Sequence, residues 1–113
     1  MTSKSNESSN LATLSAAIGV DEEDYAELLV LFIDTSGVEL KEMKAAFKNG
    51  DFTKAAKAAH SIKGAALNLG LMELSALSEA VETVLKEGPA SALGALAARL
   101  DSELDNLTGL LPS

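Results

Sequence analysis

The feature of this sequence that most limits its fold is the spacing of apolar residues at intervals of three and four. The most regular run steps by 3, 4, 3, 4 and 3 residues; it consists of Phe52, Ala55, Ala59, Ile62, Ala66 and Leu69. Residues at such intervals share one face of an α-helix. We therefore predict a helix over residues 52–69 with this run as its buried seam. No stretch alternates apolar and polar residues as a half-buried strand would.

The same spacing predicts four further helices, separated by residues that favour helix caps and turns. They cover residues 11–18, 22–48, 72–87 and 91–107, with Asp21 as the expected N-cap of the longest helix. The expected buried positions are Tyr25, Leu29, Phe32, Leu40, Met43, Phe47, Leu74, Leu77, Val81, Val84, Leu93, Leu96, Leu100, Leu104 and Leu107. Ser36 interrupts the stripe of its helix.

Long helices joined by connections of two to four residues are typical of antiparallel bundles. We expect an all-α fold, an antiparallel four-helix bundle with a short additional N-terminal helix. This domain is expected over residues 11–113. The polar residues 1–10 are expected to form a disordered tail, because they have nothing to bury.

Composition excludes several classes of function. The formal charge is −8, from 17 acidic and 9 basic residues, so the chain lacks the basic surface needed for nucleic acid or an anionic membrane. It has no cysteine, which excludes disulfides and thiolate metal sites. No apolar stretch approaches the ~20 residues that span a bilayer, and the first ten residues lack the apolar centre of a signal peptide. We expect a soluble, cytoplasmic protein.

The one histidine, His60, is where chemistry is most expected. It lies roughly 130° around the helix from the centre of the buried seam, so it should face solvent. An exposed imidazole that is mostly neutral at cytoplasmic pH can accept a phosphoryl group. Lys63 at i+3 and Lys57 at i−3 can lean towards the ring and neutralise phosphoryl oxygens. Gly64 at i+4 leaves space beside the ring, at a cost of about 1 kcal/mol relative to alanine.

The segment from Ala59 to Gly70 resembles the signature of histidine-containing phosphotransfer (HPt) domains. It has a histidine, an apolar residue at +2, Lys-Gly at +3 and +4, and a glycine at +10. The long helix before it and the Asn49-Gly50-Asp51 turn are also similar to that family. The resemblance covers roughly residues 11–107. Gly70 is expected to permit the sharp turn into the next helix.

This resemblance implies a phosphocarrier with no ATP-binding or kinase domain of its own. His60 would carry the phosphoryl group on Nε2 and exchange it with an aspartate of a response-regulator receiver domain. Lys63 would stabilise the phosphoryl charge, and Gly64 would leave room for the group and the partner. The chain would bind no cofactor, since Mg²⁺ would belong to the receiver. The expected partner contacts are Thr53, Ala56, Lys57 and Leu67.

Leu67 departs from the family pattern, in which the position at +7 is usually small. It could anchor the receiver through an apolar contact, or it could restrict which receivers fit. Both readings stay open at the level of sequence.

Two alternatives to a free carrier are also open. The chain could be the histidine-bearing substrate domain of a chemotaxis-type or hybrid sensor kinase, or a non-catalytic helical adaptor. A monomer is the expected state. A metal site is disfavoured, because one histidine without cysteines or facing carboxylates falls short of three or four ligands.

Overall fold

The computed structural model describes residues 10–112, and every regular element in that range is helical. The elements are α2 (Leu11–Ile18), α3 (Glu22–Lys48), α4 (Phe52–Asn68), α5 (Met72–Glu87), the 3₁₀ turn η1 (Ala90–Ala92) and α6 (Leu93–Thr108). The prediction of an all-helical fold is confirmed. The expected tail lies outside the described residues except for Asn10, whose side chain caps α2 by accepting from the Thr13 amide.

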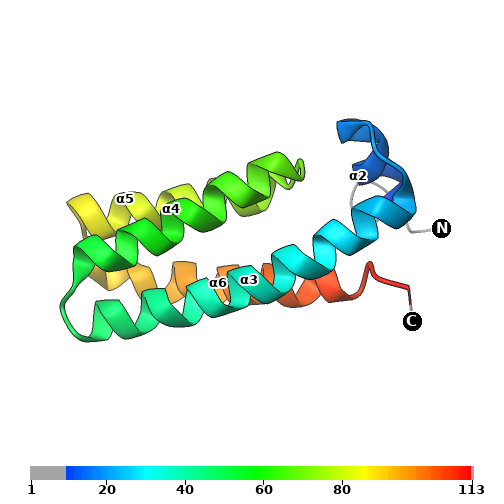
Figure 1. Cartoon of the computed structure of the whole chain (residues 1–113). Helices are drawn as coiled ribbons and strands as arrows, with labels where there is room; N and C mark the ends of the chain where they lie inside the picture. Colours follow the sequence, from blue (N-terminus) through cyan, green and yellow to red (C-terminus); the bar gives the residue numbers. More distant parts are fainter. Residues whose placement is uncertain (1–9, 113) are drawn as a thin grey trace.

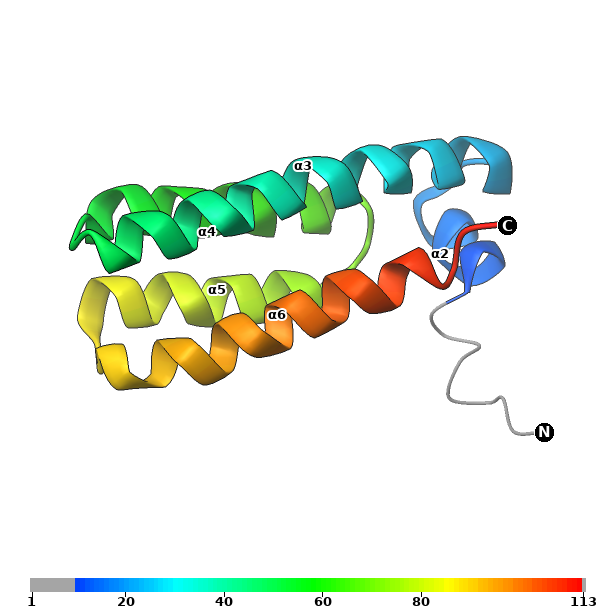
Figure 2. The same ribbon diagram turned by 90° about the horizontal axis from the view of Figure 1, so that it is seen from below.

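The four long helices lie side by side, and each contacts two others. α3 packs against α4, α4 against α5, α5 against α6, and α6 against α3 (Figures 1 and 2). The short α2 packs against α3, at the end of the molecule where the C-terminus also lies. The last predicted helix is divided in the structure, since residues 90–92 form a 3₁₀ turn before α6 begins at Leu93.

Small residues on α4 fix how closely its neighbours approach. Ala55, Ala59 and Ala66 are fully buried on the same face as Ile62, so α3 and α5 contact a nearly flat helix surface. At the far end of α4, the buried Tyr25 hydroxyl donates to the Leu69 carbonyl over 2.6 Å. This bond ties the start of α3 to the end of α4, and it uses a carbonyl that the helix itself leaves unpaired.

The turn between α4 and α5 needs a glycine, as the sequence predicted. Gly70 has φ of +73°, a left-handed conformation that other residues adopt only with strain. A Cβ at this position would also lie 3.3 Å from the Ile18 Cγ2 of α2. The backbone turn therefore favours glycine, and any other residue here would also press on the Ile18 side chain of α2.

Five details of the predicted core and caps are wrong, two of them because Phe47 and Leu96 are half-buried rather than buried. Phe52 is 42% exposed, because it occupies the first turn of α4 at the end of the bundle. One face of its ring stacks on Phe47, with the ring centroids 5.2 Å apart. On α5 the buried residue is Leu85 and not Val84, which is half-buried. Asp21 occupies the N-cap position of α3, but its side chain makes no capping hydrogen bond.

Candidate functional site

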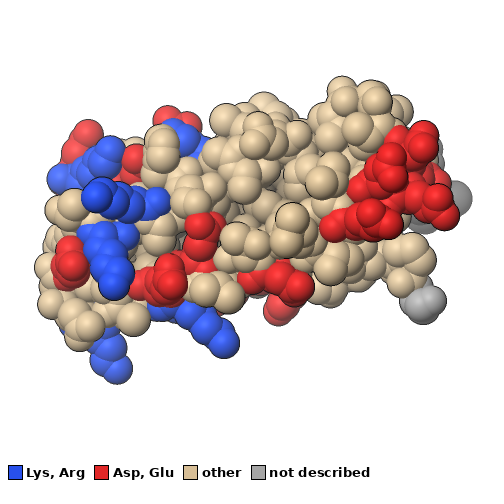
Figure 3. Space-filling model, viewed as in Figure 1, with Lys and Arg blue, Asp and Glu red and all other residues tan. Residues whose placement is uncertain are grey.

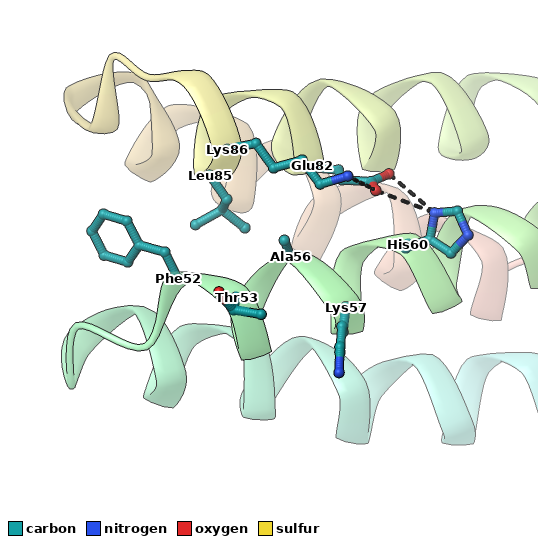
Figure 4. Close-up of a pocket in the computed structure, with 8 residues that line it drawn as sticks. All are labelled: Phe52, Thr53, Ala56, Lys57, His60, Glu82, Leu85 and Lys86. Carbon is teal, nitrogen blue, oxygen red and sulfur yellow. Dashed lines mark hydrogen bonds and ion pairs between the residues drawn. The ribbon is translucent and has the colours of Figure 1, made fainter.

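His60 projects from the middle of α4 towards solvent, as its helical angle predicted. Its side chain is 64% exposed. The Nδ1 atom faces Glu82 of α5, 3.3 Å from Oε1 and 3.2 Å from Oε2 (Figure 4). A carboxylate accepts hydrogen bonds and cannot donate them when ionised, so this contact favours the tautomer with the proton on Nδ1. The lone pair is then on Nε2, on the ring edge that points away from Glu82.

Glu82 is the buried centre of a small ionic cluster. Only 9% of its surface is exposed, and cations approach it from two helices. Lys63 Nζ of α4 lies 3.5 Å from Oε1, and Lys86 Nζ, one turn along α5, lies 3.0 Å from Oε2. Burial alone raises the pKa of Glu82, but hydrogen bonds from Lys86 and His60 outweigh it and hold the pKa of this carboxyl below its ordinary value. Glu82 is therefore an anion that orients His60.

Glu82 was not predicted from the sequence, and the expectation that no carboxylate faces His60 is wrong. A signal for it exists on α5. Ser75, Ser78 and Glu82 are spaced by three and four residues, and all three are buried, so they form a polar line along the face that α5 turns towards its neighbours. A lone buried glutamate on such a line needs a cationic partner, and His60 with Lys63 provides it.

The two lysines flanking His60 on α4 differ in position. Lys63 is 22% exposed and its ammonium group is held at Glu82, on the Nδ1 side of the ring. Lys57 does not lean towards the ring as expected; Figure 4 shows it extended towards α3. On the side of α4 that faces α3, the Ser61 hydroxyl donates to Glu39. Contacts on both sides of His60 thus hold the orientation of α4.

Gly64 has no packing role in the described part of the chain. A Cβ built there meets no heavy atom within 4 Å, so close contact between helices does not explain the glycine. Leu67, one further turn along, is 48% exposed. The surface of α4 beyond His60 is therefore open, and an exposed leucine stands at its end.

The other expected partner contacts line a groove on the opposite side of His60. Thr53, Ala56 and Lys57 share a cavity of about 690 Å³ with His60 and Glu82 (Figure 4). Its remaining lining residues are Phe52, Leu85 and Lys86. Ala56 is buried in the floor of this groove, whereas Thr53 and Lys57 are exposed at its edge. Leu67 is not part of the groove.

A family comparison agrees with this geometry. A family model described as Hpt domain matches residues 27–109. The chain belongs to the HPt domain family. HPt domains are phosphocarrier domains rather than kinases, and they function in phosphorelay signalling with receiver domains and kinases. Comparisons with curated proteins and with solved structures gave no match.

Among residues 10–112, no group of three or more histidine, cysteine, aspartate or glutamate side chains is placed to hold a metal ion. No helix in the same range is long and apolar enough to cross a membrane.

Proposed function

We propose that this HPt domain is the phosphocarrier of a multistep phosphorelay, accepting a phosphoryl group on His60 and exchanging it with a receiver-domain aspartate. Its framework would be the antiparallel bundle of α3, α4, α5 and α6, working as a monomer. The observation that carries the proposal is the contact between His60 Nδ1 and Glu82. It leaves the Nε2 lone pair available on the exposed edge of the ring, where a second protein can reach it.

In the proposed step, the Nε2 lone pair attacks the phosphorus atom of the receiver's aspartyl phosphate. An N–P bond forms, the P–O bond to the aspartate breaks, and the carboxylate leaves with the electron pair. The ring keeps its proton on Nδ1 and gains positive charge, which the Glu82 anion faces across 3.2 Å. Mg²⁺ on the receiver would supply most of the charge neutralisation on the transferring group.

Two residues of α4 would assist this transfer. Lys63 is held at Glu82, within one helical turn of His60, so its ammonium group can move to the phosphoryl oxygens as they arrive. Gly64 has no neighbour within 4 Å of a Cβ position, and the space it leaves would accommodate the phosphoryl group and the receiver. In these roles the HPt domain would supply the nucleophile and the space around it, and the receiver would supply the metal.

The test is to mix the purified protein with phosphorylated receiver domains and Mg²⁺, and to measure intact mass before and after acid treatment. We expect one acid-labile phosphoryl group on the wild type and none on His60→Gln. A wild type that stays unmodified with a broad receiver panel and with phosphoramidate would contradict the proposal and favour the adaptor alternative.

A further inference from the structure

The groove between α4 and α5 beside His60 combines an apolar floor with a charged rim. Ala56 and Leu85 form the floor, and the ring of Phe52 stands at one end. Phe52 is 42% exposed, an unusual position for a phenylalanine in a chain with so few aromatic residues. At the other end lie His60 and Glu82 (Figure 4). The groove therefore begins directly beside the reactive histidine, within the area that a protein docked on His60 can cover.

The lysines are distributed unevenly over the molecule. The net charge is −8, yet the lysines of the described residues gather in the half of the molecule where α3 ends and α4 begins (Figure 3). They are Lys41, Lys44, Lys48, Lys54, Lys57, Lys63 and Lys86. Acidic residues gather at the opposite end, where α3 begins (Figure 3). An anionic partner is therefore repelled from the acidic end and finds its cationic contacts at the end with the groove.

The two lysines that line the groove differ in how they are engaged. Lys86 is bound to Glu82 at 3.0 Å. Lys57 is exposed, and within residues 10–112 no carboxylate forms an ion pair with it. Its charge is therefore available at the edge of an apolar cavity.

We propose that this groove is a docking site for the receiver domain and takes an apolar side chain that lies next to a carboxylate on the receiver surface. Phe52 contacts the apolar side chain, and Lys57 pairs with the carboxylate. The inference rests on the proposed function, because a receiver that presents an aspartyl phosphate to His60 brings an anionic face to this end of the molecule. The groove then gives specificity for receivers with an apolar and an acidic residue side by side.

The charged half of the site is tested by comparing Lys57→Glu with Lys54→Glu. Both replace an exposed lysine on α4, but Lys54 does not line the groove. The probe is the first purified receiver of a panel, phosphorylated with acetyl phosphate and Mg²⁺, that transfers to the wild type. Each variant's rate with this receiver is divided by its labelling rate with phosphoramidate. We expect this ratio to fall about tenfold for Lys57→Glu, with a deficit that shrinks as salt is added, and to fall much less for Lys54→Glu.

The apolar half is tested by comparing Phe52→Ala with Met72→Ala, which truncates an exposed apolar residue outside the groove. Thermal unfolding followed by circular dichroism checks that both variants fold. We expect the ratio to fall about fivefold or more for Phe52→Ala, a hot-spot truncation, and to stay near the wild-type value for Met72→Ala. Wild-type ratios for both Lys57→Glu and Phe52→Ala would overturn the docking proposal while leaving phosphotransfer intact. A wild type labelled by neither reagent would instead overturn the proposed function.

Discussion

The carboxylate of Glu82 decides which nitrogen of His60 is free to react. It lies within 3.3 Å of Nδ1 through both oxygens, and a carboxylate has no proton to donate to a ring nitrogen. A glutamine at this position would keep one acceptor oxygen but lose the charge that faces the ring during transfer. An alanine would remove both.

We therefore expect a graded effect of two substitutions at Glu82. Losing a charge-assisted hydrogen bond is equivalent to about tenfold or more in rate, so Glu82→Ala should slow receiver-to-His60 transfer at least that much and Glu82→Gln less. ¹⁵N spectra of the ring report the tautomer directly, and the alanine variant should show less of the Nδ1–H form. Equal rates for all three proteins would exclude an orienting role for Glu82.

We expect Lys63 to matter more for phosphoryl transfer than for stability. Its partner Glu82 keeps Lys86 and His60 when Lys63 is removed, so Lys63→Ala should cost little stability. Loss of one charge-assisted contact to the phosphoryl oxygens should slow transfer about tenfold. Stopped-flow transfer rates and urea unfolding separate the two effects, with Lys54→Ala as the control. Transfer at the wild-type rate would remove Lys63 from the mechanism.

Ser36 of α3 lies in the hydrophobic core and is expected to lower the stability of the fold. It is fully buried, and its hydroxyl is the one buried side-chain polar atom of the described residues without a hydrogen-bond partner. Ser78 is equally buried, but its hydroxyl donates to the Leu74 carbonyl over 2.8 Å.

Replacing both serines with alanine should therefore give different results. Ser36→Ala removes an unsatisfied buried group and should raise the free energy of unfolding by about 1 kcal/mol. Ser78→Ala loses a made hydrogen bond and should be neutral or destabilising. Urea unfolding measures both, and a destabilised Ser36→Ala would show that the hydroxyl has a partner in solution.

Substitutions at two glycines in helix interiors distinguish the effect of helix propensity on stability from the effect of side-chain size on receiver access. Gly64 in α4 and Gly37 in α3 both leave the space around a Cβ empty to 4 Å. Gly64→Ala and Gly37→Ala should each raise the free energy of unfolding by up to about 1 kcal/mol. Gly64→Leu should fold but transfer slowly with receivers, because its side chain fills the space beside His60. Urea unfolding and receiver transfer rates check these outcomes; normal transfer by Gly64→Leu would show that the space is not needed.

At the scale of helices, the sequence predicted which way a side chain points better than which residue of a neighbouring helix it contacts. The spacing of apolar residues placed four long helices within a few residues of their observed ends and turned His60 outward correctly. It could not identify Glu82, since a helical angle gives a side chain's direction around its own axis and not which residue of the next helix it meets. That pairing depends on how α4 and α5 align. The prediction that Phe52 is buried failed for a related reason. Phe52 continues the apolar seam of α4, but the bundle ends beside it.

The ionic cluster at Glu82 also connects the site to the stability of the whole molecule. It joins α4 to α5 through Lys63 and His60 on one side and Lys86 on the other. The pKa of Glu82 is lowered in the folded protein, so the folded state binds this proton less tightly than the unfolded chain does. Such a group stabilises the fold at pH values above its unfolded pKa, and this contribution is lost as the pH falls through the folded pKa.

We therefore expect the wild type to have a higher unfolding free energy than Glu82→Gln at pH 6 to 7. This difference should shrink as the solution is acidified below the ordinary glutamate pKa of 4.5. The other carboxylates titrate in both proteins, so subtracting the two stability curves isolates the contribution of Glu82. Urea titrations at closely spaced pH values from about 7 down to 3 give the difference, and Glu79→Gln serves as the control, an exposed glutamate on the same helix. A gap that widens towards low pH would mean that the carboxyl is protonated more easily in the folded protein than in the unfolded chain, against the cationic surroundings that the structure gives it.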